Sequence, residues 1–327
     1  MKARTNKKHG SAWLRALAGL PGAVGLGLWA LYKAAFRSPN KVQDDPFNIP
    51  SGEQYQAERE RMRNMIARLL KEPWEPVYIE SFDGLKLHGQ FYLRDPKAPL
   101  AIGCHGYRGN PARDFSGGAM IALDMGMNLL LIDERAHGKS EGHTITLGAK
   151  EQKDISRWLQ WGEDWAKEVG DPEKPIFLYG VSMGAASVLM AAGGEVPKTL
   201  AGVIADSPYS SAKDIVMQLA KDAHLPRKPV FWIVWLAEKL FGGADLREAD
   251  AVKAAAQIKV PVMILHGLED HFVHDSLSVK IQAANPELIR RYTFEGAGHG
   301  LSFIVDEPRY RKLTEAFTKE CLERINH

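Results

Sequence analysis

Short apolar runs alternate with amphipathic stretches over most of the chain. Six of these runs have the length of buried strands, at 100–104, 128–132, 176–179, 200–205, 262–265 and 289–294. Helix-like stretches lie between them; in residues 151–169, for example, Ile155, Trp158 and Leu159 fall on one helical face. Alternation of this kind is typical of a parallel sheet with helices packed on both faces.

Two further strand-like segments precede these six runs. Residues 77–82 and 85–92 alternate apolar and polar positions, and the Asp83-Gly84 dipeptide between them is favoured in tight hairpin turns. An antiparallel hairpin followed by six strands predicts a doubly wound, mostly parallel sheet of eight strands.

Two segments depart from this rhythm. Residues 54–71 form a charged amphipathic helix after the proline-containing linker 38–52, and we expect this helix to pack on the edge of the domain or, alternatively, to bind a partner. The interval 207–259 is much longer than an ordinary crossover and contains the apolar run Val230 to Ala237. It predicts a helical lid, with Trp232 and Trp235 lining an apolar substrate pocket; a buried helix in a long crossover is the alternative.

The N-terminus has a different pattern. Residues 1–15 hold basic residues and no acidic ones, and residues 16–32 are uncharged. This order predicts an uncleaved signal-anchor, with a cleaved signal peptide or a peripheral apolar arm as alternatives. The positive-inside rule would then place the catalytic domain outside the cytoplasm. A chain beginning near Ser38 is expected to be soluble and active.

The chain therefore divides into three predicted parts. Residues 1–37 form a basic N-terminus with a membrane anchor, residues 38–72 a linker with an amphipathic helix, and residues 73–327 a domain whose lid covers about 207–259.

Composition is that of a globular protein with one large core. Of the 327 residues, 45% are hydrophobic and 25% charged, and the formal net charge of +2 gives no indication of a nucleic-acid partner. Cys104 and Cys321 are the only cysteines; no disulfide between them is favoured, and no zinc-type spacing occurs.

A nucleophile motif follows the strand at 176–179. The sequence Gly180-Val181-Ser182-Met183-Gly184 lies between that strand and a helix of small residues, the context in which a sharp turn projects a serine hydroxyl above a sheet. Glycines are needed on both sides because a Cβ would collide with the neighbouring backbone. Ser182 is therefore the predicted nucleophile.

A serine hydroxyl needs an adjacent base and a carboxylate that orients the base. His299 lies in Gly296-Ala297-Gly298-His299-Gly300 after the last strand, where a permissive backbone allows the side chain to reach across the sheet. Three carboxylates in the required chain order compete for the third position: Asp270, Asp206 and Glu269.

An oxyanion hole requires two backbone N–H groups aimed at one point. Met183, directly after the nucleophile, is predicted to supply one, and Tyr107 in the glycine-rich loop after 100–104 the other. His105 in the same loop is expected to be structural.

Several motifs together resemble the α/β-hydrolase superfamily, in its serine esterase and peptidase branch. They are His105-Gly106, Asp133 to Ser140, Gly180 to Gly184, Asp206 to Tyr209, the His-Gly-x-x-Asp motif ending at Asp270, and Gly298 to Gly300. The resemblance covers about three quarters of the chain, and is closest to bacterial membrane-anchored hydrolases. Ala136 departs from the pattern, because glycine is commoner at that position.

The resemblance implies that Asp270 is the acid of the triad, that residues 133–137 shape a turn near the site, and that no cofactor is needed. It also implies a serine hydrolase that cleaves a carboxylic ester of a small-molecule acyl substrate. An aminopeptidase, a thioesterase, or a non-catalytic binding protein on the same fold are the alternatives. The histidines His266, His271 and His274 are spaced as in a loop, and no metal site is predicted.

Overall fold

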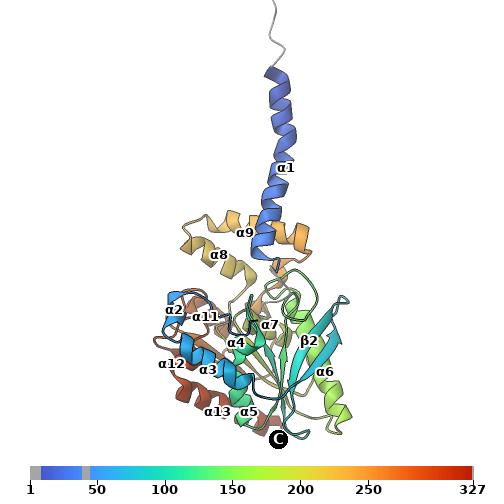
Figure 1. Cartoon of the computed structure of the whole chain (residues 1–327), viewed down its shortest axis with the longest axis vertical. Helices are drawn as coiled ribbons and strands as arrows, with labels where there is room; N and C mark the ends of the chain where they lie inside the picture. The colour runs from blue at the N-terminus through green and yellow to red at the C-terminus, as the bar shows by residue number, and fades with distance from the viewer. Residues whose placement is uncertain (1–8, 39–44, 326–327) are drawn as a thin grey trace, which may run out of the picture.

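The computed structural model describes residues 9–38 and 45–325, with backbone only for residues 9–21. An eight-stranded sheet forms its centre, in the order β1-β2-β4-β3-β5-β6-β7-β8 (Figure 1). β2 pairs antiparallel with β1 and β4, and all other neighbours are parallel, which confirms the predicted mostly parallel sheet of eight strands. The strands are β1 (Glu75–Glu80), β2 (Lys86–Tyr92), β3 (Leu100–Cys104), β4 (Asn128–Ile132), β5 (Ile176–Val181), β6 (Leu200–Asp206), β7 (Val262–Gly267) and β8 (Ile289–Phe294).

Each face of the sheet supports a separate apolar core. Along β5, Ile176 and Leu178 point into one core, while Phe177 and Tyr179 point into the other. Both faces are covered, so the central strands are continuous apolar runs rather than alternating ones. The first core is closed by α6 (Glu151–Glu168), α7 (Met183–Ala192), α10 (Ala251–Ala255) and α11 (Asp275–Ala284). The second is closed by α3 (Arg59–Leu69), α4 (Pro111–Phe115), α5 (Gly118–Asp124), α12 (Ser302–Val305) and α13 (Glu307–Ile325).

The predicted helix at 54–71 is interrupted. A short helix α2 (Glu53–Gln56) and the longer α3 are separated by Ala57 and Glu58. α3 buries Met62, Ile66 and Leu69, the apolar stripe expected from the sequence.

The interval between β6 and β7 forms a layer of helices. It contains α8 (Ala212–Asp222), α9 (Arg227–Ala237), the helical turns η1 (Glu238–Gly242) and η2 (Leu246–Glu248), and then α10. α8 and α9 lie at the end of the sheet from which the N-terminal helix leaves the molecule (Figure 1). In α9 only Phe231 and Ala237 are buried, so most of its apolar surface is not covered by the domain.

The N-terminal helix α1 (His9–Ala35) contains the predicted apolar segment 16–32 and projects away from the domain (Figure 1). Its last turns are part of the fold, because Leu28, Tyr32 and Phe36 belong to the first core, and Phe36 is only 1% exposed. In the part of the chain that the structure describes, no helix has both the length and the apolar character needed to cross a bilayer. The predicted basic residues up to position 8 and linker residues 39–44 lie outside the described residues.

Candidate active site

Ser182 occupies a sharp turn between β5 and α7. Its backbone has φ 56° and ψ −113°, an unfavourable conformation for a residue with a side chain. A Cβ at Gly180 would collide with the backbone of Gly184, and a Cβ at Gly184 would collide with the carbonyl of Cys104. The two glycines of the motif thus allow the helix, the turn and β3 to approach one another.

The three residues predicted as a triad come together at the carboxyl ends of the strands. His299 Nε2 lies 2.9 Å from Ser182 Oγ, and His299 Nδ1 lies 2.7 Å from Asp270 Oδ2. All three are buried, with Asp270 only 3% exposed. This arrangement lets the imidazole take a proton from the serine while the carboxylate holds the ring in one orientation.

The competing carboxylates lie elsewhere. Glu269 is exposed, and its amide donates to the carbonyl of Ala297. Asp206 accepts hydrogen bonds from Tyr310 Oη at 2.9 Å and Ser207 Oγ at 3.0 Å. Of the three carboxylates, Asp270 is the one hydrogen-bonded to His299.

The surroundings of Asp270 favour its ionised form. Burial alone raises the pKa of this carboxyl, but the charge of His299 and hydrogen bonds from His266, His299 and the Val273 amide hold the pKa well below its usual range. Oδ1 accepts the backbone N–H groups of Phe272 and Val273 at 2.9 and 2.7 Å. Those bonds leave Oδ2 to face the imidazole.

The loop after β3 positions the proposed second oxyanion donor. The amide of Gly106 donates to Asp114 Oδ2 at 2.8 Å, and the amide of Arg108 donates to His137 Nε2 at 3.1 Å. With both neighbouring amides already bonded, Tyr107 supplies the candidate amide of this loop, and it lines the same pocket as Ser182. Met183 is the first residue of α7, where backbone N–H groups have no intrahelical acceptor.

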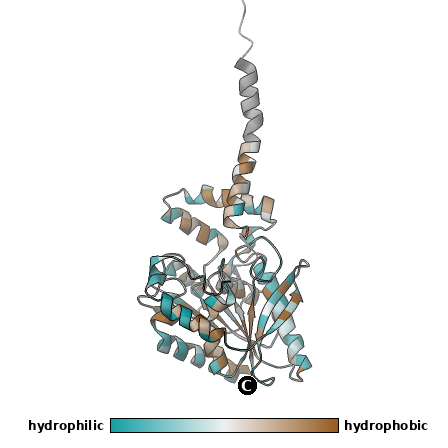
Figure 2. Ribbon diagram, viewed as in Figure 1, coloured by the Kyte–Doolittle hydropathy of each residue, from teal (hydrophilic) through white to brown (hydrophobic). Residues whose placement is uncertain are grey.

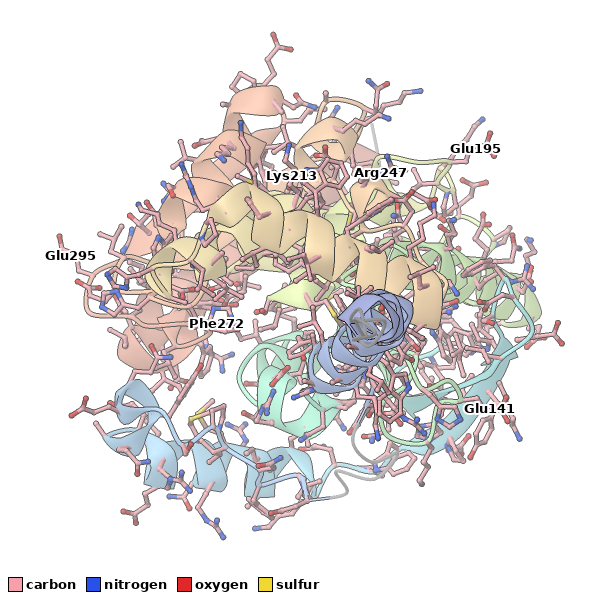
Figure 3. The ribbon with its side chains drawn as sticks, turned by 90° about the horizontal axis from the view of Figure 1, so that it is seen from above. Glu141, Glu195, Lys213, Arg247, Phe272 and Glu295 are labelled. Atoms are coloured by element: carbon pink, nitrogen blue, oxygen red, sulfur yellow. The ribbon has the colours of Figure 1, made fainter. Side chains whose placement is uncertain are left out.

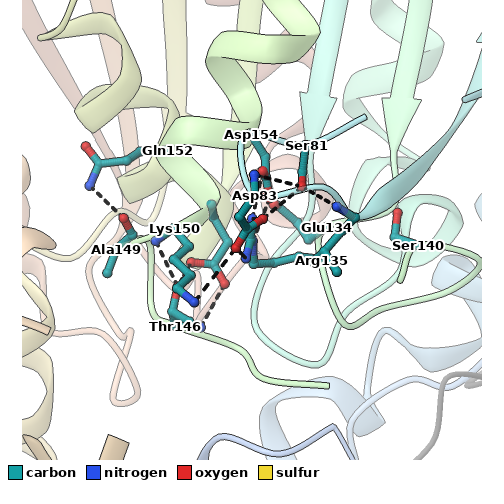
Figure 4. Close-up of polar contacts among 12 residues, drawn as sticks. Ser81, Asp83, Glu134, Arg135, Ser140, Thr146, Ala149, Lys150, Gln152 and Asp154 are labelled. Atoms are coloured by element: carbon teal, nitrogen blue, oxygen red, sulfur yellow. Dashed lines mark hydrogen bonds and ion pairs between the residues drawn. The ribbon is translucent and has the colours of Figure 1, made fainter. Parts of the chain in front are cut away.

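The turn at 133–140 supports this loop. His105 Nε2 accepts the amide of Glu134 at 3.1 Å, which fits the structural role expected for this histidine. Ala136 has φ 64°, a left-handed conformation that glycine adopts more easily, which fits the glycine expected at this position from the resemblance. Arg135 joins the turn to Asp83 of the hairpin and Asp154 of α6 (Figure 4).

Two carboxyl groups beneath this turn are buried, and the pKa of each is raised. Burial raises the pKa of Asp154 to about 6 despite its bonds to Arg135. Burial also raises the pKa of Glu134 well above its usual range, and neither of its oxygens has a hydrogen-bond partner among the described residues. The groups that act on these two carboxyls are Arg135, Glu151 and Asp83, and Asp154 also acts on Glu134; the triad is not among them.

A pocket of about 460 Å³ opens above Ser182. Tyr55, Met62 and Met65 form one wall of this pocket, and Phe272 and Phe303 line it as well. The first three residues belong to the segment 54–71, which was expected at the edge of the domain. The methionines lie on the apolar stripe of α3, but nothing in the sequence indicates that this stripe faces the catalytic loop.

α2 also fixes the histidine loop, which sequence reasoning missed. Tyr55 Oη donates to the carbonyl of His299 at 3.0 Å, and Gln54 Oε1 accepts the amide of His299 at 3.3 Å. These contacts span more than half the chain, so no local pattern could reveal them.

The predicted pocket tryptophans require a correction. Neither Trp232 nor Trp235 is among the residues that line the pocket around Ser182. Trp235 Nε1 donates to Asp245 Oδ1 at 2.8 Å, and Trp232 is 50% exposed with its ring against Trp235. The two rings do share a face, as their spacing predicts, but that face is not part of the pocket lining.

The end of α1 is bound to the loop that carries Tyr107. Tyr107 Oη donates to the carbonyl of Ala35 and Arg108 Nη2 to the carbonyl of Ala34, each at 2.6 Å. A chain beginning at Ser38 would lose both acceptors and the buried Phe36. The last turns of α1 thus contact the domain across the boundary predicted at Ser38.

The described residues contain no arranged set of metal ligands. No group of three or more histidine, cysteine, aspartate or glutamate side chains within residues 22–38 and 45–325 is arranged to hold a metal ion. His266 instead contacts the carbonyl of Val273 at 2.9 Å. Cys104 and Cys321 are both buried and free.

Comparison with known proteins shows which proteins this chain is similar to. The sequence model of the serine aminopeptidase S33 family, Hydrolase_4, matches residues 101–249. The Pyrococcus furiosus esterase Pf2001 has a similar structure, with a TM-score of 0.62 and 26% identity over 77% of this chain and 93% of the esterase. These similarities and the order of the strands show that the chain has the α/β-hydrolase fold.

Two relatives by sequence extend this comparison. The uncharacterized protein YqkD of Bacillus subtilis is 27% identical over 73% of this chain and 77% of its own length. The thiohydrolase aneE of Aspergillus aculeatus is 28% identical over 38% of this chain and 40% of its own length. The chain is therefore similar both to an esterase and to a thiohydrolase.

Proposed function

We propose that this α/β-hydrolase is a serine hydrolase that cleaves carboxylic esters through an acyl-enzyme. The observation that carries the proposal is the unbroken chain of contacts from Ser182 Oγ through His299 to Asp270. Similarity to an esterase supports the choice of an ester bond.

Each step of the reaction has a residue to perform it. Ser182 attacks the ester carbonyl and passes its proton to His299 Nε2, while Asp270 stabilises the imidazolium that forms. The amides of Met183 and Tyr107 stabilise the oxyanion of the tetrahedral intermediate. His299 then protonates the leaving alcohol, and a water molecule activated by the same histidine hydrolyses the acyl-enzyme.

A thioester is the second candidate substrate, because the thiohydrolase aneE is among the relatives. The same triad and oxyanion donors serve a thioester, since the attacked atom is again a carbonyl carbon. An aminopeptidase is less well supported. Two buried carboxylates line the pocket, Asp114 and Asp206. Asp114 pairs with Arg113 at 2.6 Å, and Asp206 accepts hydrogen bonds from the hydroxyls of Tyr310 and Ser207, so both already have partners within the protein.

We further propose that the protein associates with a membrane through residues 16–32, with its catalytic domain outside the cytoplasm. The uncharged segment, its basic flank and the projection of α1 away from the domain support this placement. The segment 207–259 is proposed to act as a lid at the same end of the molecule.

Replacement of Ser182 by alanine tests the chemistry. Ser182→Ala should abolish labelling by a fluorophosphonate probe and lower turnover of short-chain esters by several orders of magnitude, because the triad acts as a unit. Ser207→Ala, at another buried serine with a positive φ, is the matched control and should keep both signals.

Two results would contradict the proposal. Persistent labelling of the Ser182→Ala protein would identify a different nucleophile. A folded wild-type protein that neither reacts with the probe nor hydrolyses esters or thioesters would indicate a binding protein on this fold.

A further inference from the structure

Large apolar side chains are exposed on three adjoining elements at one end of the molecule. We name them together the lid–helix surface: Val24, Leu26 and Trp29 of α1, Trp232, Ile233 and Leu236 of α9, and Leu240 and Phe241 of η1. The exposed fraction reaches 68% at Leu26 and 60% at Leu240. A continuous apolar surface of this kind is typical of a site that another apolar phase covers.

The three elements form one surface because they contact each other. α9 and η1 pack against α1, and the rings of Tyr32 and Phe241 lie 5.9 Å apart. Figure 1 shows α9 running across the base of α1, and Figure 2 shows hydrophobic positions on both helices. A flat surface perpendicular to the axis of α1 would therefore contact α9 along its length.

Basic side chains border this surface. Arg227 and Lys228 are exposed at the start of α9, and Lys239 of η1 is exposed as well. On α1, the ammonium group of Lys33 lies 4.5 Å from the centre of the Trp29 ring. The acidic residue of the same stretch, Glu238, is buried and adds no negative charge to the outside.

We propose that the lid–helix surface docks on an anionic lipid bilayer, with α9 lying in the interface. Apolar and aromatic residues bordered by basic ones are the composition of helices that lie in the headgroup region. Such a helix need not span the bilayer, which suits the 11 residues of α9. The proposal deepens the membrane association proposed above and rests on it.

Docking would bring the active-site pocket next to the bilayer. Tyr107 and Arg108 line the pocket and also bond to the last residues of α1, so the pocket lies beside the base of this helix. Figure 3 looks onto this end of the molecule, with α1 seen end-on and Phe272, another pocket residue, at the side. Acyl substrates dissolved in the bilayer are the class that this arrangement favours.

Fluorescence of a single label tests the docking. The full-length chain carrying Ile233→Cys is labelled with an environment-sensitive dye and mixed with vesicles of phosphatidylcholine and phosphatidylglycerol. Both natural cysteines are buried, so the new thiol is the accessible one. Val305→Cys on α12, 41% exposed, is the matched control.

The label at position 233 should shift its emission to shorter wavelength in the presence of vesicles. Lipids with a nitroxide near the headgroup should quench it at least about twofold, because interfacial helices lie about 5–10 Å into the headgroup–acyl boundary. The label at position 305 should change little.

Three outcomes would overturn the docking. Weak and equal quenching at both positions in vesicle-bound protein would agree with attachment through α1 but would rule out the docking of α9. A protein that does not bind vesicles would rule out both the attachment through α1 and the docking of α9. A shift at position 233 that depends on protein concentration without vesicles assigns the surface to a second copy of the chain.

Charge reversal supplies a second measurement. The double variant Arg227→Glu, Lys228→Glu should lose most of the quenching and turn over a long-chain ester held in vesicles several-fold more slowly. Lys312→Glu, Lys319→Glu on α13 is the control of equal charge and should keep both. Turnover of a soluble short-chain ester should be the same in all of these proteins. A wild-type protein that does not hydrolyse this ester would instead contradict the hydrolase proposal.

Discussion

Two buried aspartates near the ends of neighbouring strands have pKa values shifted in opposite directions. Burial raises the pKa of Asp206, and the hydroxyls of Tyr310 and Ser207 only partly offset this. At Asp270 the charge of His299, with several hydrogen bonds, outweighs burial and lowers the pKa. A carboxylate that must stabilise an imidazolium has to be ionised, so the environment favours Asp270 as the acid.

Asp270→Asn should therefore lower kcat on a soluble ester by about 10⁴-fold, as for the acid of other triads, because the amide stabilises the wrong imidazole tautomer. Asp206→Asn is the control, since its amide oxygen can still accept from Tyr310, and it should keep kcat within about tenfold. Melting temperatures of both variants separate misfolding from chemistry. The reverse ranking would move the role of the acid to Asp206.

At the scale of elements, η1 contains a buried carboxyl with no partner. Glu238 is fully buried, neither of its oxygens is hydrogen-bonded among the described residues, and burial together with the charge of Glu151 raises its pKa to about 9. In the unfolded chain the same carboxyl has its ordinary pKa of 4.5. Between these two values the folded protein holds a proton that the unfolded chain has lost.

The free energy of unfolding should consequently fall as pH rises from about 4.5 to 9, by up to about 1.4 kcal/mol per pH unit for this one proton. Glu238→Gln cannot ionise, so its stability should match the wild type near pH 5 and exceed it at pH 9. Urea unfolding at pH 5, 7 and 9 measures the difference, with Glu195→Gln on an exposed loop as control. A constant difference across pH would mean that Glu238 titrates normally in the folded protein.

The elements differ in how far the sequence could predict them. Strands β3 to β7 were predicted because each is almost entirely buried and is therefore a largely apolar run. Ser182, His299 and their glycines follow the strand ends, so their neighbourhood was also predictable. The pocket wall formed by α2 and α3 was not, because the contact from Tyr55 to His299 depends on tertiary packing. Trp232 and Trp235 were misplaced because hydropathy gives the shared face of a helix but not its direction.

At the scale of the whole molecule, α1 connects the lid–helix surface with the loop that carries Tyr107. Its outer part exposes Val24, Leu26 and Trp29, whereas its last turns insert Leu28, Tyr32 and Phe36 into the domain core. Its terminal carbonyls then accept bonds from Tyr107 and Arg108. One helix thus has an apolar outer part and a structural end that contacts the active site.

Truncation should separate these two roles. A chain beginning at Gly25 keeps the buried residues and both carbonyl acceptors, so it should retain the wild-type melting temperature and its turnover of a soluble ester. A chain beginning at Ser38 should melt several degrees lower, since loss of one buried large aromatic residue costs about 3–5 kcal/mol. It should also lower kcat more than it raises KM, because the Tyr107 amide, which we propose stabilises the transition state, is no longer held. Equal stability and kcat in the two truncated proteins would show that the last turns of α1 are dispensable and that the loop positions Tyr107 by itself.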